Sequence, residues 1–307
     1  MSSPTPLRVL VVSPDGADAL AGTPELEAVV VDPGDPSTWP EQARAVVAGG
    51  RTPDELEPLL AGVQGIEVVQ LLSAGVEGWV GRLPAGVDLV NARGAHGGAT
   101  AEWAVAALLA VRRELPLFGE QQRRRTWAAA TSPGLQGAHV VVVGAGDLGE
   151  QTRRRLDGFD ARTTLVARSA REGVRAMADL PELLPTADAV VLVVPLTDET
   201  RGLVDAGFLA ALPDGSVVVN AARGSVVDTA ALLAEVASGR LRAALDVTDP
   251  EPLPSDHPLW TVPGVLLTPH VGGDTEGSGE RAWRVAREQL LQLAGGERPA
   301  NTVGQHY

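Results

Sequence analysis

Three polar side chains in the second half of the chain, Arg223, Glu251 and His270, have types and spacing that could form a reacting centre. An imidazole exchanges protons near neutral pH, and a carboxylate beside it orients the ring and favours its charged form. A guanidinium can hold a carboxylate through two hydrogen bonds. Singly, each residue is typical of a surface or a loop. Each lies, however, in a segment that follows a predicted strand. The carboxyl ends of parallel strands form a ligand crevice, so we expect the three to converge at one sheet edge.

A glycine-rich turn precedes these segments. The apolar run 140–143 leads directly into Gly144-Ala145-Gly146-Asp147-Leu148-Gly149 and then into a helical pattern. This is G-x-G-x-x-G in the strand-then-helix context that it requires. Gly144 permits the tight turn, Gly146 lets the backbone approach a pyrophosphate, and Gly149 lets helix and strand pack closely. The helix N-terminus adds N–H donors for phosphate oxygens. We therefore predict a dinucleotide site that includes Asp147 and Leu148.

The strand expected after this helix, 164–167, ends without the acidic residue that usually binds the adenosine ribose. Arg168, Ser169 and Arg171 stand there instead, about 20 residues past the turn. Guanidinium and hydroxyl donors suit the charge and the acceptor oxygens of a 2′-phosphate. This favours NADP(H) as cofactor, with NAD(H) as the alternative. The other interpretation is that both arginines are solvated loop residues.

Composition excludes several other kinds of chemistry. The 25 cationic residues are all arginine, the chain has 39 acidic residues, and the net charge is −14. An acidic surface argues against nucleic acid or an anionic membrane as partner. The absence of lysine excludes Schiff-base chemistry, and the absence of cysteine excludes thiolate nucleophiles and disulfides. We expect no metal site. No export signal or membrane-spanning stretch is evident, which points to the cytoplasm.

The elements that must position these residues form two series of alternating strands and helices. Apolar runs suited to a parallel sheet covered by helices are 7–13, 28–31, 45–48, 66–72 and 87–90 in the first series. A long apolar helix is predicted over residues 99–115. The strands of the second series are 139–143, 164–167, 189–194, 216–221, 243–247 and 265–268. A last helical segment, from about Glu276 through Arg281 to Ala294, is expected to return and pack on the first series.

The order of these motifs resembles the D-isomer-specific 2-hydroxyacid dehydrogenase family. The resemblance runs from about Ile66 to Thr302 and is strongest from Leu135 to Gly273. Besides the motifs above, the segments 195–202 and 214–220 match. The resemblance implies an α/β fold of two doubly wound parallel-sheet domains. These are a flavodoxin-like substrate domain (1–95 and 276–307) and a Rossmann dinucleotide-binding domain (96–275).

The resemblance also assigns roles to single residues. It makes His270 the acid/base, Glu251 its partner and Arg223 the clamp for the substrate carboxylate; Asp246 would face the nicotinamide carboxamide. Further cofactor contacts are implied for Val194, Pro195, Ala221, Ala222, Arg223, His270 and Gly272. The substrate would be held by Arg223 and His270 and by the loop of Ala74, Gly75 and Val76, whose amides could form an anion nest.

Two positions depart from the family pattern. Glu77 stands where aspartate is more common, and Thr248 where an aromatic residue is common, so the floor of the pocket can differ. Trp79 could line the pocket or belong to the core. His96, His139, His257 and His306 match no motif position and are interpreted as structural.

The expected reaction is hydride transfer between NAD(P)H and the C2 carbonyl of a small 2-oxo acid, giving a D-2-hydroxy acid. Glyoxylate or hydroxypyruvate reduction is the preferred type. The formate branch lacks the glutamate that Glu251 supplies, and the phosphite branch uses a lysine that this chain lacks. A short phosphoglycerate dehydrogenase-like enzyme and a catalytically silent dinucleotide sensor remain as alternatives. We expect a homodimer.

Overall fold

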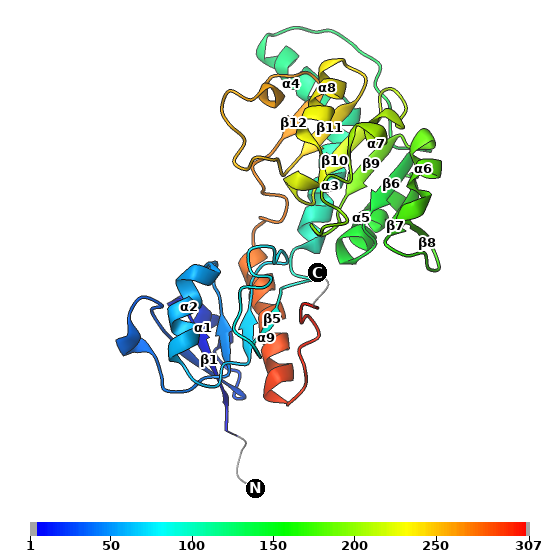
Figure 1. Cartoon of the computed structure of the whole chain (residues 1–307). Coiled ribbons are helices and arrows are strands. Elements are labelled where there is room, and N and C mark those ends of the chain that lie inside the picture. Colours follow the sequence, from blue (N-terminus) through cyan, green and yellow to red (C-terminus); the bar gives the residue numbers. More distant parts are fainter. Residues whose placement is uncertain (1–4, 305–307) are drawn as a thin grey trace. The chain divides into compact units, whose positions relative to one another are not determined.

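The computed structural model describes residues 5–304 and contains two compact units (Figure 1). Unit 1 comprises the chain up to His96 together with the part from Glu276 onward, and unit 2 comprises Gly97–Thr275. Each unit is a parallel sheet with helices on its faces, which confirms the predicted α/β class. The assignment of unit 1 to substrate and unit 2 to dinucleotide stays a prediction at this stage.

Unit 1 contains a sheet of short, buried, β-branched-rich strands. They are β1 (Leu7–Val11), β2 (Leu26–Val30), β3 (Ala45–Val47), β4 (Val68–Gln70) and β5 (Asp88–Val90). All neighbours pair in parallel, in the order β2-β1-β3-β4-β5. This is the strand order of flavodoxin-like folds, in which connections cross over through helices.

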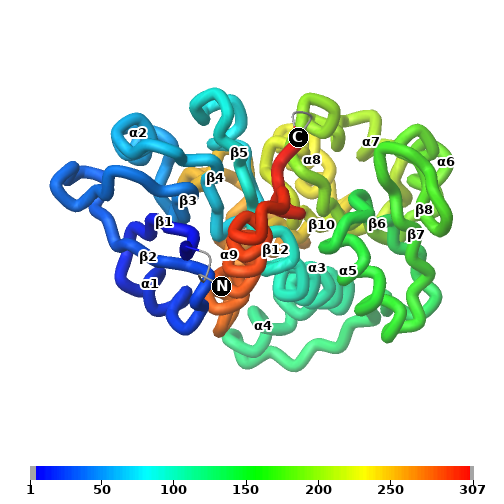
Figure 2. The backbone as a smooth tube through the Cα atoms, turned by 90° about the horizontal axis from the view of Figure 1, so that it is seen from below, coloured from blue at the N-terminus to red at the C-terminus, as the bar shows by residue number. Residues whose placement is uncertain are grey.

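Three helices cover this sheet: α1 (Pro14–Leu20), α2 (Pro53–Gly62) and α9 (Ser278–Ala294). Leu56 and Leu59 of α2 pack on one face, and Leu290 and Leu293 of α9 pack on the other. The last helix therefore returns to unit 1, as Figures 1 and 2 show. Val303 then donates its amide to Leu89 of β5 (2.8 Å).

Unit 2 contains the larger sheet. Its strands are β6 (His139–Val143), β7 (Arg162–Ala167), β8 (Val174–Ala176), β9 (Ala189–Leu192), β10 (Val217–Asn220), β11 (Arg242–Leu245) and β12 (Val265–Leu267). The order is β12-β11-β10-β9-β6-β7-β8, with every pair parallel. From β6 the chain adds β7 and β8 on one side, and it then adds β9 to β12 on the other side. The strand order therefore reverses between β6 and β9. Open sheets of this kind bind dinucleotides at that switch point.

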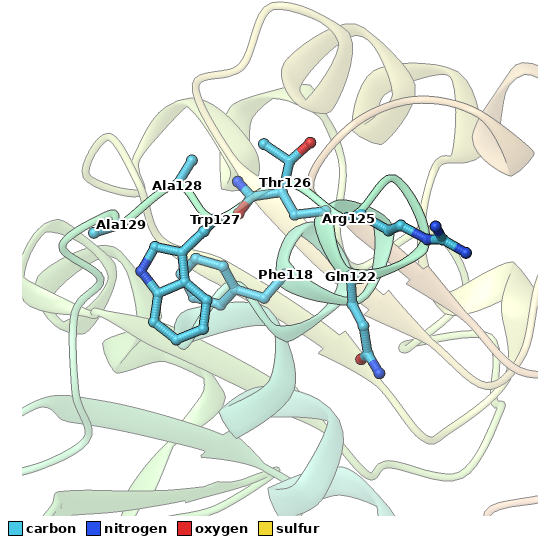
Figure 3. Close-up of a pocket in the computed structure, with 8 residues that line it drawn as sticks. Phe118, Gln122, Arg125, Thr126, Trp127, Ala128 and Ala129 are labelled. Carbon is cyan, nitrogen blue, oxygen red and sulfur yellow. The ribbon is translucent and has the colours of Figure 1, made fainter.

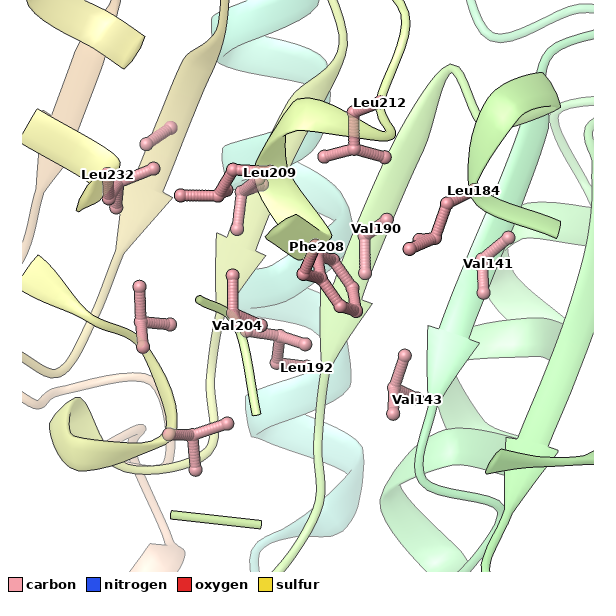
Figure 4. Close-up of a cluster of buried hydrophobic side chains, with 14 of the residues drawn as sticks. Val141, Val143, Leu184, Val190, Leu192, Val204, Phe208, Leu209, Leu212 and Leu232 are labelled. Atoms are coloured by element: carbon pink, nitrogen blue, oxygen red, sulfur yellow. The ribbon is translucent and has the colours of Figure 1, made fainter. Parts of the chain in front are cut away.

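Helices bury both faces of the larger sheet. The helices of unit 2 are α3 (Gly97–Arg112), α4 (Leu115–Arg123), α5 (Asp147–Asp157), α6 (Leu180–Leu183), α7 (Ala206–Ala210) and α8 (Thr229–Ala237), and all but α4 contribute to its core. α3 and α5 cover one face, whereas α6, α7 and α8 cover the other. In Figure 4, Phe208 and Leu209 of α7 lie over Val190 and Leu192, and α3 runs behind the sheet. Sheet strands buried on both faces explain the near-continuous apolar runs.

Two elements differ from the sequence-based expectation. β8 is a three-residue edge strand where the sequence predicts no strand, because so short a segment carries no periodic signal. The helix expected over 99–115 ends at Arg112, and Glu114 adopts a left-handed backbone (φ 57°) before α4 begins. Within the described residues, no helix is both long and apolar enough to cross a bilayer. A cytoplasmic location stays a prediction.

His139 at the start of β6 is only 4% exposed. Its Nδ1 lies 3.1 Å from the carbonyl oxygen and from the hydroxyl of Thr186, and its Nε2 lies 2.9 Å from the hydroxyl of Thr164. Burial is the main cause that lowers the pKa of His139, since the charged ring would lose its hydration. The folded state therefore favours the neutral imidazole.

We expect the free energy of unfolding to fall as the pH drops below about 6.5, because the unfolded chain then takes up a proton that folded His139 resists. Above that pH, the contribution of His139 to the free energy of unfolding is fully present. His139→Gln should flatten the dependence, by at most about 1.4 kcal/mol per pH unit. Urea unfolding of both proteins at pH 7.5 and 5.5 measures it. If the free energy of unfolding changes equally between the two pH values in both proteins, the pH dependence does not come from His139.

Candidate active site

The glycine turn after β6 leaves space where a pyrophosphate would need it. Gly144 has a φ of 118°, which favours glycine, and a Cβ at Gly149 would lie 1.9 Å from the Gly144 carbonyl oxygen. Gly146 differs, because a Cβ there would meet nothing within 4 Å. The turn and the helix thus close tightly around an open Gly146 backbone. These residues fit a dinucleotide phosphate.

α5 begins directly at this turn, with Gly146 as its N-cap and no side-chain cap. The first amide groups of a helix have no intrahelical acceptor and carry partial positive charge. Asp147 is exposed and Leu148 half-buried in this first turn. The helix therefore offers donors to an anion at the switch point between β6 and β9.

The loop after β7 carries the predicted adenosine contacts. Arg168, Ser169 and Arg171 are all exposed. Arg168 pairs with Glu199, with Nε and Oε2 2.7 Å apart. Arg171 donates from Nη2 to the carbonyl of Ala145 in the glycine turn (2.6 Å). Pairing between Arg171 and Val174 fixes this loop against β8. The Arg171 guanidinium therefore lies beside the glycine turn, whereas that of Arg168 lies beside Glu199 in the loop after β9.

His270 and Glu251 form a hydrogen-bonded pair, with Nδ1 and Oε1 2.7 Å apart. The two side chains are 47% and 41% exposed. Since a carboxylate only accepts, Nδ1 carries a proton directed at Glu251. This is the only hydrogen bond that the ring makes within residues 5–304. Nε2 is therefore the nitrogen that can exchange a proton with another molecule.

Asp246 at the end of β11 holds the turn that carries His270. The carboxylate is 4% exposed and accepts from the Thr268 hydroxyl (2.6 Å) and from the amides of Val271 (2.9 Å) and Gly272 (2.8 Å). The backbone oxygen of Asp246 accepts from the amide of His270 (2.8 Å). His270 itself has a φ of 54°, which a non-glycine residue seldom adopts without such support. The nicotinamide contact of Asp246 stays a prediction.

Arg223 lies in the turn after β10 and is half-buried. Buried Asn220 shapes this turn, since its side chain accepts from the amide of Ala222 and donates to the carbonyl of Arg223 (both 3.0 Å). Arg223 donates from Nη1 to Ala222 (2.6 Å). A Cβ at Gly224 would lie 1.9 Å from the carbonyl oxygen of Thr248, so the turn packs directly on the segment that leads to Glu251.

A further bond joins the same two segments: the hydroxyl of Ser225 donates to Asp249 (2.6 Å). The structure therefore brings the Arg223, Glu251 and His270 segments together at the carboxyl edge of the sheet. The remaining predicted cofactor contacts follow the neighbouring strands. They are Val194 and Pro195 after β9, Ala221 and Ala222 after β10, and Gly272 after β12.

In unit 1, the predicted substrate loop follows β4. The amides of Ala74, Gly75 and Val76 donate to no acceptor within the described residues. The Asn91 side chain donates to the carbonyl of Ala74 (2.9 Å) and holds the loop. The loop thus has the donors of an anion nest. Trp79, predicted either to line the pocket or to belong to the core, belongs to the core of unit 1, because its side chain is 8% exposed and packs there.

Sequence reasoning did not single out Asn220, Thr268, Asp249 and Glu199. A signal existed for Asn220, because a polar residue that ends a run of valines must find partners when buried. None existed for Asp249 or Glu199, whose partners are about 24 and 31 positions away along the chain. His306 lies outside the described residues.

Comparison with known proteins now adds to this geometry. Residues 105–272 match the family model described as D-isomer specific 2-hydroxyacid dehydrogenase, NAD binding domain. A solved structure with a similar fold is a D-isomer specific 2-hydroxyacid dehydrogenase from Xanthobacter autotrophicus Py2 in complex with NADPH and MES. It has 29% sequence identity and a TM-score of 0.85, and the match covers 98% of this chain and 99% of that one.

Two relatives extend the comparison. D-3-phosphoglycerate dehydrogenase of Mycobacterium tuberculosis is 38% identical over 220 residues, which make up 68% of this chain but only 41% of that protein. Glyoxylate reductase/hydroxypyruvate reductase of Mus musculus is 30% identical over 321 residues, covering 95% of this chain and 96% of the relative. The chain is therefore a member of the D-isomer-specific 2-hydroxyacid dehydrogenase family.

Proposed function

We propose that the chain reduces a small 2-oxo acid to the D-2-hydroxy acid with NAD(P)H. The observation that carries this proposal is the His270–Glu251 pair, placed on the same carboxyl edge as the glycine turn. Such a pair presents one exchangeable proton, at Nε2, to a reacting oxygen. Family membership supports the reaction class.

Each residue has a definite part in this chemistry. A reduced nicotinamide supplies a hydride when bound. Arg223 binds the carboxylate of the 2-oxo acid and orients it. Nε2 of protonated His270 gives its proton to the carbonyl oxygen of C2 as that oxygen gains charge. The ring is left neutral and still donates from Nδ1 to Glu251, so its orientation is kept for the reverse reaction.

For the substrate, glyoxylate or hydroxypyruvate is the proposed type. Support comes from the mouse relative, which matches over nearly the full length of both chains. In a chain of net charge −14, an anionic substrate needs local donors, and Arg223 and the amides at 74–76 are suited to supply them. The second candidate is 3-phosphoglycerate oxidation, favoured by the 38% identity to the mycobacterial relative. The rate of reduction of glyoxylate and hydroxypyruvate, compared with the rate of oxidation of 3-phosphoglycerate, distinguishes the two candidate functions.

The proposed cofactor is NADP(H), with NAD(H) also accepted. No carboxylate follows β7 to bind the ribose diol, and Arg168 and Arg171 stand there instead. The similar Xanthobacter structure is a complex with NADPH, which supports the same preference.

His270→Asn should lower kcat for 2-oxo acid reduction by about 10²- to 10⁴-fold. Asparagine tolerates the left-handed backbone at this position, with its φ of 54°, but it cannot transfer the proton. The affinity for NADPH, measured by fluorescence titration, should change little. His257→Asn is the control and should keep its rate, because the His257 side chain caps the turn 258–260 by accepting from the amide of Leu259 (3.3 Å). Full activity of His270→Asn would remove His270 from the acid/base role.

Cofactor binding by the wild type without turnover of any 2-oxo acid would favour the alternative function, a catalytically silent dinucleotide sensor.

Replacing both Arg168 and Arg171 by alanine should raise the KM for NADPH by tenfold or more, since charge-assisted contacts to the 2′-phosphate are lost. The KM for NADH should stay within about twofold. Steady-state kinetics with both cofactors at one glyoxylate concentration measures this. Equal losses with the two cofactors would contradict the 2′-phosphate site.

We also propose that the chain forms a homodimer through α4 and the segment that follows it. Trp127 is fully exposed, and Leu115 and Leu117 are 55% and 45% exposed. A pocket of about 520 Å³ lies here, and Figure 3 shows the rings of Trp127 and Phe118 on the same side of the loop. Figure 2 shows this segment at the edge of unit 2. Exposed apolar patches of this kind mark interaction surfaces.

The charge of this segment favours a second copy as the partner. It carries three consecutive arginines at 123–125, two of which pair with Glu120, whereas the whole chain has a net charge of −14. A cationic, apolar segment is thus complementary to the acidic surface of another copy of the chain.

Trp127→Ser should raise the dissociation constant of the dimer by tenfold or more, because buried tryptophans contribute strongly to interfaces. Sedimentation velocity over a concentration series measures this. Trp260→Ser is the matched control, since Trp260 is 51% exposed but lies outside the segment. A wild-type chain that is monomeric at all concentrations, or equal effects of both changes, would contradict this interface.

A further inference from the structure

The ion pair between Arg168 and Glu199 joins two loops at the carboxyl edge of the larger sheet. Arg168 directly follows β7, and Glu199 lies in the turn after β9. Their Nε and Oε2 atoms are 2.7 Å apart. The two strands are not neighbours, because β6 lies between them. The pair therefore spans the end of β6, where the glycine turn starts, across about 10 Å of sheet.

The turn that carries Glu199 is well fixed. Buried Thr200 donates its hydroxyl to the carbonyl of Pro195 (2.6 Å) and accepts from the amide of Thr197 (2.8 Å). Side-chain bonds of this kind stabilise a turn independently of its surroundings. Glu199 is therefore held opposite Arg168 by the backbone, and only the two side chains need to move to break the pair.

The location of the pair coincides with the proposed adenosine site. Dinucleotides bind across the switch point between β6 and β9, with the adenosine ribose at the end of the strand that follows the glycine turn. Here that strand is β7, which ends at Arg168. The guanidinium proposed to bind the 2′-phosphate is thus already bound to a carboxylate.

We propose that Glu199 limits the selectivity for NADPH by competing with the 2′-phosphate for Arg168. This inference rests on the proposed 2′-phosphate site. With NADH bound, Arg168 stays paired with Glu199 and no cation is left without a partner. With NADPH bound, Arg168 exchanges the carboxylate for the phosphate, and Glu199 then faces a second anion. Glu199 thereby lowers the preference for NADPH and lets the chain use both cofactors.

The effect has a limited size. Arg168 and Glu199 are 61% and 64% exposed, and an ion pair so accessible to water is weak and screened by salt. We therefore expect a change of about fivefold in selectivity at low ionic strength, not several orders of magnitude. The change should shrink toward about twofold or less in 0.5 M NaCl, where the Debye length is only a few ångströms.

The test compares Glu199→Gln with the wild type. Glutamine keeps the shape of the side chain and removes its charge. The ratio of kcat/KM for NADPH to that for NADH should rise about fivefold, with the NADH value within about twofold of wild type. Asp198→Asn is the matched control, because Asp198 is the adjacent exposed carboxylate and forms no ion pair within residues 5–304. Its ratio should stay at the wild-type value.

Two outcomes would overturn the inference: an unchanged ratio in Glu199→Gln, which includes equal changes with both cofactors, or the same shift in Asp198→Asn. Arg168→Ala separates the inference from the proposed function. If Arg168→Ala lowers the ratio and Glu199→Gln leaves it unchanged, only the competition by Glu199 is wrong. If Arg168→Ala also leaves the ratio unchanged, the contact of Arg168 with the 2′-phosphate is wrong, and the double replacement of Arg168 and Arg171 then tests the 2′-phosphate site itself.

Discussion

The buried carboxylate of Asp246 is the interaction on which the arrangement at the sheet edge depends. It lies at the end of β11 and binds the Thr268 hydroxyl and two amides of the next strand's turn. A buried charge is costly unless donors surround it, so the turn is restricted to the shape that supplies them. That shape includes the left-handed backbone of His270. The orientation of the imidazole thus follows from the electrostatic requirements of a residue that itself need not react.

Close approaches between backbones connect the other segments. Gly224 packs on the carbonyl of Thr248, and Gly272 packs on the carboxylate of Asp246, at distances that no Cβ would permit. The turns after β10 and β11 are therefore in direct backbone contact, and the turn after β12 packs on the Asp246 side chain. A displacement of one turn would have to move its neighbours. This rigidity suits a centre whose proton donor and anion-binding group must keep a fixed separation.

Much of this architecture could be predicted from the sequence, because it depends on local signals. Apolar runs identified nearly all strands, and the glycine turn identified the switch point. The order Arg223, Glu251, His270 placed the three segments on neighbouring strand ends. What the sequence did not reveal depends on contacts between distant positions: the pairing of Arg168 with Glu199, the bond from Ser225 to Asp249, and the edge strand β8. Each is decided by three-dimensional proximity, and residue type alone is compatible with many partners.

Gly146 has a consequence of a different kind. Gly144 and Gly149 are required by the fold itself, through a positive φ and a close carbonyl, whereas a methyl group on Gly146 would touch no atom of the protein. Packing within the described residues therefore places no constraint on this position, and under the proposed function the steric demand there would come from the cofactor phosphate. Folding and cofactor binding are separable at this one carbon atom. An alanine at this position would give a stable chain with the same surface charge and an obstructed phosphate site, which makes it a charge-matched reference for measurements of cofactor binding.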